Sequence, residues 1–482
     1  MILPQKETLE REIKLSAPRN FSLPPLPGEP LVPRQFTSAY YDTEDHRLAQ
    51  AGITLRYRTE ARLGVWQLKL PRNGARRELE FSGGRVSPPE SIFKLLYAHL
   101  RGRSLSRIAR LRTRRSGIRV AGAEGPLADV VMDSVVALDG QHVIRYLYEL
   151  EVKLTGGSEA DLPKIEKTLR EAGAQDGDRR PKVFRVLNLE LPPSAVPVPA
   201  TAPPVEHLKS MLHIENRRLL MHDPGTRLGT DPEDLHQMRV ATRRLRAYLR
   251  AAQSMLIPEW AEPLRAELAW LGRALGVIRD LDVLLDYLDK ESSTLRSPER
   301  RAFQQVLNAL KQERTDGRRV LLEALESDRY LALLDRIEAA AQSPAVANTA
   351  VSLVDIARAE FKKLRRAMRA GGPDADDKVL HRTRIKGKRA RYAAELTEAT
   401  IGKPARRFIE QAKMLQDLLG EHQDAVVCEQ RLRKLLPHSH GRFVLLALGR
   451  LIERQCERRR MVCGALPKVW SKLQKRADKV WG

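Results

Sequence analysis

The chain has 482 residues, enough for two or three domains with hydrophobic cores of their own. It carries 85 Lys and Arg against 61 Asp and Glu, a formal net charge of +24, which favours a polyanionic partner. Only 5% of the residues are aromatic. Because single-stranded nucleic acids are gripped by stacking on aromatic rings, this composition argues against a nucleic acid as that partner.

Cysteine usage and apolar runs predict a cytoplasmic protein with no membrane partner. Cys428, Cys456 and Cys463 fit no metal-binding spacing and argue against a disulfide framework. The first ten residues, MILPQKETLE, lack the cationic start and apolar core of a signal peptide. No apolar run approaches the roughly 20 residues that a membrane helix needs.

A proline-rich segment divides the chain into two parts of different character. Residues 188–206 hold six prolines and no glycine, which is typical of an extended spacer. The sequence before it reads as β and the sequence after it as α. We therefore predict a β-rich domain over residues 1–190, a linker over 191–205 and an all-α domain over 206–482.

In the first domain, short alternating stretches separated by Gly or Pro turns predict an antiparallel sheet. They lie at residues 9–15, 53–60, 66–70, 76–81, 129–138 and 146–154, and helices are predicted at 88–101 and 159–173. Charged side chains occupy alternate positions and therefore share one face of each strand. The charged sets are Glu10, Glu12 and Lys14; Arg56 and Arg58; Gln67 and Lys69; Arg76, Glu78 and Glu80; Glu149, Glu151 and Lys153.

Each charged face alone is typical of the solvated side of an antiparallel sheet. The whole set favours a different interpretation. Carboxylates suit hard divalent cations, and rows of Arg and Lys suit phosphate oxygens. A metal and several cations around one phosphate chain is the arrangement that phosphoryl transfer needs.

The stretch Glu10-x-Glu12-x-Lys14 resembles the ExExK signature of the CYTH family, the triphosphate tunnel metalloenzymes. Supporting motifs follow in the family's order: YYDT (40–43), Arg56-x-Arg58, WQLK (66–69), RRELE (76–80), TRRS (113–116), Asp133, Glu149-x-Glu151, then Lys182 and Arg185. The resemblance covers almost all of residues 5–190. It implies an eight-stranded antiparallel tunnel, an α+β barrel, that binds triphosphate together with Mg²⁺ or Mn²⁺.

Carried over by position, the resemblance assigns each charged residue a role. The metal would be surrounded by five carboxylates: Glu10, Glu12, Asp133, Glu149 and Glu151. The phosphates would be held by Lys14, Arg56, Arg58, Lys69, Arg115 and Lys182, which with Glu10 and Glu12 form the predicted catalytic set, and Arg185 would assist. Either Arg114 or Arg115 could be the tunnel arginine, and either Glu78 or Glu80 an additional carboxylate.

The second domain contains a cationic stretch that occurs twice. HQMRVATRRLRAYLR (236–250) corresponds to HRTRIKGKRARYAAE (381–395) at an offset of 145 positions. Steps of three and four place the predicted polyanion contacts along one side of each helix. These contacts are His236, Arg239, Arg243 and Arg246 in the first copy, and His381, Arg384, Lys388 and Arg391 in the second. Arg244 and Arg389 point off this row.

A second match follows each row at an offset of 144, with Gly276 over Gly420 and Asp280 over Asp424. Such a repeat indicates one supersecondary unit used twice. Ordinary solvated surface is the simplest alternative for a single row, but two rows in register favour binding of a polyanion. A metal site on the histidines is poorly supported, because neither has a His, Cys or carboxylate partner four residues on.

The two rows resemble the CHAD family over roughly residues 206–475. That resemblance implies a pseudo-symmetric pair of four-helix bundles whose basic residues bind inorganic polyphosphate. His236 and His381 would either bond phosphate or serve a structural role.

The two resemblances together lead us to expect a metal-dependent inorganic triphosphatase joined to a polyphosphate-binding helical domain, in the cytoplasm or on polyphosphate granules. The expected partners are tripolyphosphate as substrate and long-chain polyphosphate. Thiamine triphosphatase or adenylate cyclase activity in the same tunnel stays open, as does a non-catalytic polyphosphate-binding or granule-targeting protein. A nucleic-acid binder is the weakest alternative.

Overall fold

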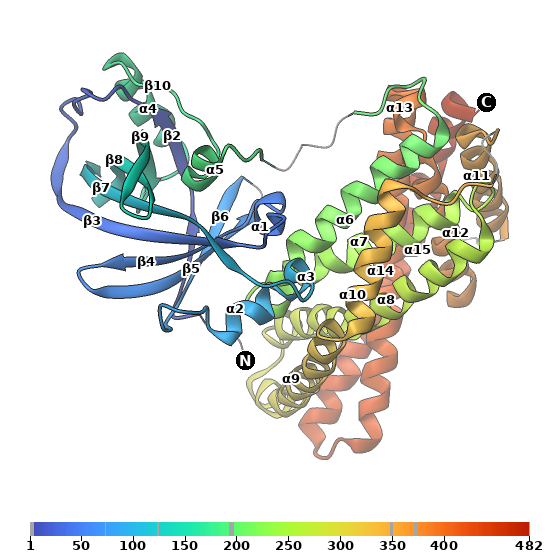
Figure 1. Ribbon diagram of the computed structural model, residues 1–482. Coiled ribbons are helices and arrows are strands. Elements are labelled where there is room, and N and C mark those ends of the chain that lie inside the picture. Colours follow the sequence, from blue (N-terminus) through green and yellow to red (C-terminus); the bar gives the residue numbers. More distant parts are fainter. Residues whose placement is uncertain are drawn as a thin grey trace. The chain divides into compact units, whose positions relative to one another are not determined.

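The computed structural model describes residues 4–72, 74–122, 125–191, 197–347, 350–370 and 375–481. The chain separates into two compact units, residues 1–194 with 223–228, and residues 195–222 with 229–482 (Figure 1). Residues 192–196 of the predicted linker lie outside the described residues, and the predicted domain boundaries stay predictions.

The first unit is built on an antiparallel sheet. In the described part of the chain it contains ten strands: β1 (Lys6–Glu10), β2 (Glu12–Ser16), β3 (Gly28–Asp42), β4 (Thr54–Glu60), β5 (Leu63–Arg72), β6 (Ala75–Phe81), β7 (Ser106–Gly122), β8 (Gly125–Asp139), β9 (His142–Leu154) and β10 (Gln175–Asp176). Their order in the sheet is β1-β6-β5-β4-β3-β7-β8-β9-β2-β10.

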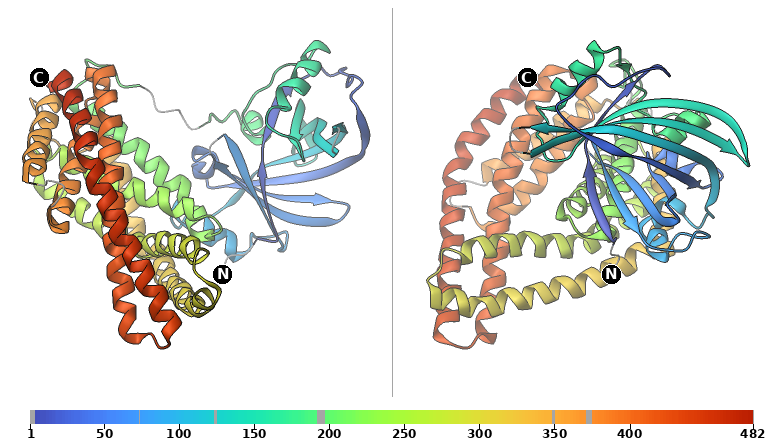
Figure 2. Two further views of the ribbon diagram at one scale, coloured as in Figure 1. Left: turned by 180° about the vertical axis from the view of Figure 1, so that it is seen from behind. Right: turned by 90° about the vertical axis from the view of Figure 1, so that its left-hand side faces the viewer.

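The N-terminal segment meets both ends of this order. β1 pairs with β6, while β2, only one residue further on, pairs with β9. The sheet is therefore strongly curved (Figure 2), and the N-terminal segment changes its partner strand at Arg11, whose carbonyl accepts from the Leu154 amide at 3.3 Å. If β1 and β2 are counted as the single predicted strand and the two-residue β10 is left aside, the described sheet has the eight strands expected.

Short helices and apolar residues cover the outer face of the curved sheet. The outer residues of β4, β5 and β6, including the fully buried Trp66, Leu68 and Leu79, pack against α1 (Arg47–Gln50), α2 (Glu90–Leu95) and α3 (Tyr97–Leu100). The outer residues of β2, β8 and β9 pack against α4 (Leu162–Glu171). The opposite, concave face is left to the charged residues, and α5 (Lys182–Leu187) follows after β10.

The second unit is all-helical in the residues that the structure describes. Its α-helices are α6 (Pro204–Leu228), α7 (Pro232–Ala251), α8 (Pro258–Ser292), α9 (Ser297–Leu325), α10 (Asp328–Gln342), α11 (Leu353–Ala370), α12 (Asp377–Glu395), α13 (Glu398–Ile401), α14 (Lys403–Leu435) and α15 (Arg442–Trp481). None of the described helices combines the length and the apolar composition required to span a bilayer.

The sequence repeat is a structural repeat. Helices α7, α8 and α9 correspond in chain order to α12, α14 and α15, and α6 precedes the first set as α11 precedes the second. Both cationic helices begin with the same cap: the Asp231 carboxylate accepts from the Glu233 amide, and the Asp376 carboxylate accepts from the Lys378 amide, 145 positions later. The caps extend the repeat by about one helical turn beyond the basic row.

Buried apolar clusters stabilise this unit in the residues that the structure describes. Helices α11, α12, α14 and α15 enclose one core, which contains Phe361, Phe408 and Trp481. A second core, which contains Phe303 and Leu448, joins α8 and α9 to α14 and α15. The two sets of helices therefore share apolar residues instead of folding as separate bodies.

Candidate functional site

Strand register gathers the predicted tunnel residues on the concave face of the sheet. Arg115 pairs with Asp133, Asp133 with Glu149, and Lys14 with Glu151. Likewise Arg56 pairs with Gln67, and Lys69 with Glu78. Since paired residues of antiparallel neighbours lie on the same side of the sheet, each pairing adds one more strand to the same charged face.

Three carboxylates converge on one lysine. Lys182 Nζ lies 2.7 Å from Asp133, 3.0 Å from Glu149 and 2.6 Å from Glu151. The three carboxylic side chains belong to β8 and β9 and are at most 3% exposed. The lysine comes from the first residue of α5, and Arg185 of the same helix bonds Glu149 at 2.6 Å. We call Asp133, Glu149 and Glu151 the carboxylate cluster.

The structure distinguishes the two candidate tunnel arginines. Arg115 donates to Asp133 at 2.7 and 2.6 Å and to Glu151 at 3.0 Å. Arg114 is exposed on the opposite face of β7. Successive side chains of a strand point to opposite faces, so the inward position of Arg115 excludes Arg114 from the same site.

The other two carboxylates, Glu10 and Glu12, are tied to the carboxylate cluster by Lys153. Lys153 Nζ lies 3.8 Å from Glu10, 3.5 Å from Glu12 and 3.0 Å from Glu151. Lys153 is absent from the predicted site residues, although it shares the face of Glu149 and Glu151. This shared face is the feature of the sequence from which Lys153 could have been predicted as a site residue.

Lys69 and Lys14 also lie among the carboxylates. Lys69 lies 2.5 Å from Glu10 and 2.7 Å from Glu78. Glu80 instead accepts from Gln67, so both candidate extra carboxylates face the interior but have different partners. Lys14 lies further from its carboxylates, 3.5 Å from Glu12 and 3.6 Å from Glu149.

Arg56 and Arg58 lie on the same inner face but make different contacts. Arg56 donates to Gln67 at 2.8 Å and to the Tyr40 hydroxyl at 3.1 Å. Arg58 lies 3.6 Å from the centroid of the Phe36 ring, and Glu60 accepts from it at 3.2 Å. Burial lowers the pKa of Arg58 to about 10, and the charges of Arg56 and Arg115 add to this effect. An incoming anion would relieve that repulsion.

The carboxyl groups differ in pKa according to their neighbours. Burial alone would raise the pKa of Glu78, but Lys69 and Arg56 lower it to about 2. Burial also opposes ionisation of Glu151, yet Lys153 and Lys182 hold its pKa well below the usual value. Burial raises the pKa of Glu149, and the charge of Glu151 contributes. Such divergence between adjacent carboxyl groups is typical of functional sites.

The donor chemistry of this face fits a divalent cation. In the described residues, no three His, Cys, Asp or Glu side chains already form a metal-binding group, because ammonium and guanidinium groups lie between the carboxylates. Glu12 Oε2 and Glu149 Oε1 are nevertheless buried and have no aligned hydrogen bond, only lysine ammonium groups, at 3.5 Å from Lys153 and 3.0 Å from Lys182. Buried carboxylate oxygens are the ligands that Mg²⁺ and Mn²⁺ prefer.

In the helical unit, equivalent arginines lie in equivalent ways. A Cβ built on Gly276 of α8 would lie 3.6 Å from Arg239 Nη2, and one built on Gly420 of α14 would lie 3.6 Å from Arg384 Nη2. In both repeats, therefore, the guanidinium group lies beside the glycine of the helix that follows, at a distance where a Cβ would make ordinary van der Waals contact. Arg239 also pairs with Asp280 at 3.1 Å.

Four cations of α7 and α12 form a basic cluster: Arg239, Arg243, Arg384 and Lys388. Burial and the charges of Arg384, Arg243 and Arg239 lower the pKa of Lys388 to about 7, against a weaker opposing effect of Asp424. Arg243 Nε and Arg384 Nε are buried without hydrogen-bond partners. The cluster thus holds more positive charge than its two neighbouring aspartates neutralise.

The two histidines have different surroundings. His381 Nδ1 lies 2.6 Å from Gln423 Oε1, so a side chain of α14 orients its ring. Burial lowers the pKa of His236, and the nearby charges of Arg279, Arg243 and Arg239 add to this effect. Both rings lie at the first turns of the basic rows, but no described carboxylate completes a metal site with them.

The last predicted contact of each row differs between the repeats. Arg246 is exposed, whereas Arg391 is buried, lies 3.3 Å from Glu395 and stacks over the Tyr392 ring. The position four residues on explains the difference, because it is Arg250 in the first copy and Glu395 in the second. The charge of Arg391 is therefore neutralised within its own helix, and we do not count Arg391 as part of the basic row.

Glu395 also joins the two repeats. It accepts from Arg244 at 2.7 Å and from the Tyr248 hydroxyl at 2.5 Å, and the rings of Tyr248 and Tyr392 lie 5.9 Å apart. This contact fixes α7 against α12 and explains why Arg244, as predicted, points away from the basic row.

Comparison with known proteins adds independent findings. Residues 8–182 match the CYTH domain, and residues 211–433 match the CHAD domain. Over 433 residues the chain is 31% identical to uncharacterized proteins of two Mycobacterium tuberculosis strains, CDC 1551 / Oshkosh and ATCC 25618 / H37Rv; each match covers 83% of this chain and 82% of the relative.

Among solved structures, the CHAD domain of the plant Ricinus communis is 26% identical, with a TM-score of 0.47, and covers 58% of this chain and 95% of its own. Another solved structure is that of a Hippeastrum protein described as a putative adenylyl cyclase with a dominant triphosphatase activity. It is 18% identical, with a TM-score of 0.25, and the match covers 38% of this chain and 98% of the Hippeastrum chain.

The two domain matches occur in the predicted order, and the M. tuberculosis relatives span both of them. The resemblances drawn from the motifs are thereby confirmed. The chain belongs to the family in which a CYTH domain is followed by a CHAD domain.

Proposed function

We propose that the CYTH domain is a metal-dependent inorganic triphosphatase that hydrolyses tripolyphosphate, and that the CHAD domain binds long-chain polyphosphate. The observation that carries the first part is the convergence of buried carboxylates from β2, β8 and β9 with cations from β4, β5, β7 and α5. Burying many charges costs desolvation free energy even when they are paired, and clusters of this kind are typical of functional sites.

The cations would hold the phosphate oxygens. Arg115 and Lys182 already donate to buried anionic oxygens of the carboxylate cluster, at distances typical of charge-assisted hydrogen bonds. A phosphate chain offers oxygens of the same kind. Arg56, Arg58, Lys69 and Lys14 lie on the same face and would continue the contacts along the chain, and Lys153 adds a cation that the motifs did not identify.

The carboxylates would hold the metal. Glu10, Glu12, Asp133, Glu149 and Glu151 supply the oxygen donors, and the buried oxygens of Glu12 and Glu149, which only lysine ammonium groups contact, are the first candidates. The chemistry that a divalent cation supplies when bound at such a site is neutralisation of phosphate charge and activation of water. The cations of the chain would stabilise the charge that develops on the departing phosphate.

A substrate panel separates this proposal from the other activities of the same fold. Phosphate release would be measured from tripolyphosphate, thiamine triphosphate, ATP and long-chain polyphosphate, each with Mg²⁺ and with Mn²⁺. Preference for tripolyphosphate is the expected result. Faster turnover of thiamine triphosphate, or formation of pyrophosphate from ATP, would contradict the inorganic assignment.

The basic cluster supports the second part of the proposal. Arg239, Arg243, Arg384 and Lys388 present an excess of positive charge that a regularly spaced polyanion would neutralise, with His236, His381 and Arg246 extending the contact. Arg391 is omitted because Glu395 already neutralises it. Such binding would also place the protein on polyphosphate granules.

Competition tests the ligand class. Labelled long-chain polyphosphate would be displaced from the full chain by unlabelled polyphosphate or by DNA at equal phosphate concentration, with salt held constant because both modes are electrostatic. We expect polyphosphate to displace the label far more effectively. Equal displacement by DNA would contradict a polyphosphate-specific site.

A further inference from the structure

A hollow on the outer face of the CYTH sheet lies away from the charged interior. Its volume is about 250 Å³, and it is lined by Thr37, Ala39, Tyr41, Tyr57, Thr59, Arg85, Val86, Arg107 and Arg110. These residues come from β3, β4, β7 and the segment between β6 and α2. Tyr40, between Ala39 and Tyr41, points to the other side and bonds Arg56, so the hollow and the tunnel lie on opposite faces of β3.

A β-bulge brings two of the arginines to one face. Arg110 pairs with Ala39, and Arg107 pairs with Tyr41, because the register between β3 and β7 shifts at this point. In a regular strand, residues three positions apart point to opposite faces; here the extra residue, Ile108, reverses the alternation. Bulges are typical of places where a side chain is redirected for a purpose.

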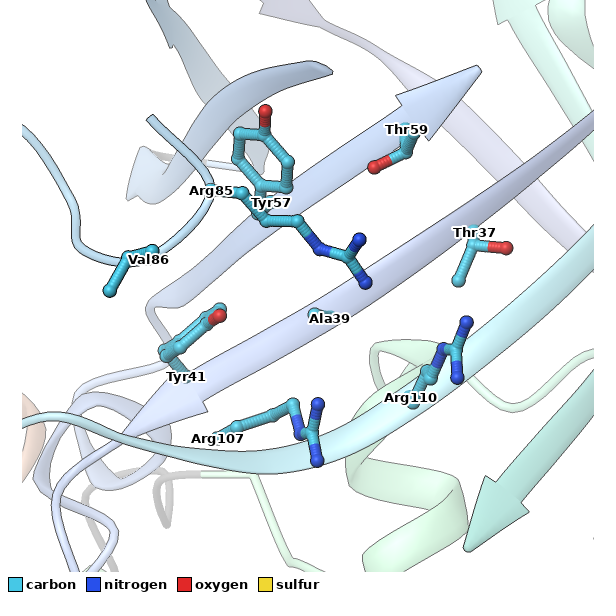
Figure 3. A pocket seen from close by; sticks show the side chains of 9 residues that line it. All are labelled: Thr37, Ala39, Tyr41, Tyr57, Thr59, Arg85, Val86, Arg107 and Arg110. Atoms are coloured by element: carbon cyan, nitrogen blue, oxygen red, sulfur yellow. The ribbon is translucent and has the colours of Figure 1, made fainter. Parts of the chain in front are cut away.

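Three guanidinium groups converge on this hollow without a carboxylate. Figure 3 shows the guanidinium groups of Arg85, Arg107 and Arg110 around Ala39. No Asp or Glu lines the hollow, and in the described residues none of the three arginines has an ion pair. Other arginines of the same unit do pair, as Arg34 does with Glu60 and Arg119 with Asp129. Like charges placed close together repel one another and destabilise the fold, and a bound anion would relieve this repulsion.

One side of the hollow is held in place by packed aromatic rings, and its base is formed by the small side chain of Ala39. Tyr41 and Tyr57 pack against the buried Trp66, with ring centroids 5.0 and 5.1 Å from it. Ala39 lies between the three arginines, where a larger side chain would fill the space. Thr37, Thr59, Tyr41 and Tyr57 complete the lining beside the arginines.

We propose that this hollow is a second anion site, which binds a phosphoanhydride chain, either free or as the tail of a nucleoside triphosphate. Guanidinium forks match the paired oxygens of phosphate, and three forks suit an anion with several phosphoryl groups better than a single carboxylate. The volume suits a short chain. The site does not depend on the proposed hydrolase activity, because it lies outside the tunnel.

Arginine labelling in the full chain tests the site directly. Phenylglyoxal labelling of individual arginines would be followed by peptide mass spectrometry, in EDTA so that no substrate is consumed. Free tripolyphosphate and ATP would be compared with KCl at equal ionic strength, and the exposed Arg19 would serve as the reference arginine. At ten times the dissociation constant, labelling of Arg85, Arg107 and Arg110 is expected to slow about tenfold.

Protection by tripolyphosphate alone would identify the free chain as the ligand, and protection by both would identify the shared phosphate tail. Arg107→Gln and Ala39→Leu should each abolish protection of Arg85, whereas Arg114→Gln, on the same face of β7 but outside the hollow, should not. Equal slowing by KCl, slowing at Arg19 as well, or full protection in Ala39→Leu would overturn the proposal. None of these results would affect the proposal for the tunnel.

Discussion

Lys182 Nζ lies 2.7 Å from Asp133 Oδ2, although 49 positions separate the two residues. The contact ties α5 to the inner face of β8, and burial opposes a charged lysine there. The surrounding carboxylates outweigh this effect, so the pKa of Lys182 is raised well above its usual value. A charge held so firmly among three carboxylates is suited to meeting an anionic substrate.

Replacement of Lys182 should therefore affect both stability and turnover. Lys182→Met removes a cationic partner from three buried carboxylates. Removing one member of a buried ion pair typically lowers the free energy of unfolding by about 3–5 kcal/mol, and we expect a loss of this size. We expect a lower urea midpoint and at least a tenfold loss of tripolyphosphate turnover, with Lys182→Arg recovering stability more than turnover. Unchanged turnover in a folded Lys182→Met protein would contradict the role assigned to this lysine.

The two neighbouring arginines of β7 offer a matched pair. Arg115→Gln removes three hydrogen bonds to Asp133 and Glu151, whereas Arg114→Gln changes an exposed side chain on the other face. We expect kcat/KM for tripolyphosphate to fall about 100-fold or more in the first, a loss of roughly 2.7 kcal/mol in transition-state stabilisation, and to change less than about twofold in the second. Steady-state kinetics of both variants, with tripolyphosphate as substrate, measures this difference in kcat/KM. Similar losses in both would show that the interior position is not what counts.

Binding of polyphosphate by the CHAD domain should depend on pH near neutrality. The lowered pKa of Lys388, about 7, means that this lysine is largely protonated at pH 6 and largely neutral at pH 8 in the free protein. A bound polyanion would restore the charge, so binding takes up a proton above pH 7 and affinity falls as pH rises, by at most about tenfold per pH unit.

Lys388→Arg is the control for this dependence, since an arginine stays charged throughout. Calorimetric titrations at pH 6, 7 and 8 should show a clear fall in affinity for the unmodified protein and a smaller one for Lys388→Arg. The facing groups are Arg384 on the same helix, Arg239 and Arg243 on α7, and Asp424 on α14. The same pH dependence in both proteins would assign it to another group, with His236 and His381 the next to replace.

The paired helix caps predict equal costs in the two repeats. Asp231→Ala and Asp376→Ala each remove the carboxylate that accepts from the first turn of a cationic helix. Each should lower the free energy of unfolding by about 1 kcal/mol, and Asn at either position should restore most of it. Urea denaturation measures both. A loss at only one position would show that the repeats are not equivalent at this end.

The sequence predicted the faces of the sheet better than its strands. The alternation of Glu149 and Glu151 located the inner face of β9 because a single buried polar face leaves a clear period of two. β3 and β7 were not predicted as strands. Pro30 and Pro33 interrupt β3, and the arginines of β7 occur on both of its faces, so neither strand shows a simple alternation.

In the helices, the repeat predicted equivalence but not its exceptions. Arg239 and Arg384 lie alike, each beside the equivalent glycine, Gly276 or Gly420, of the following helix. Arg391 departs from Arg246 because its partner four residues away is a glutamate, which no comparison of the two basic rows alone reveals. The alternation of β9 placed Lys153 on the face of Glu149 and Glu151, but its contacts with Glu10 and Glu12 cross to the N-terminal strands, and the sequence does not show them.

The most direct test of the central claim is phosphate release from tripolyphosphate by three proteins: the unmodified chain, Glu10→Gln/Glu12→Gln, and the exposed-carboxylate control Glu29→Gln. Each would be assayed with Mg²⁺, with Mn²⁺ and with EDTA. We expect rapid release that needs a divalent cation, falls at least about 100-fold in the double variant and is unchanged in the control. Release that persists in EDTA, or that is equal in all three proteins, would contradict it.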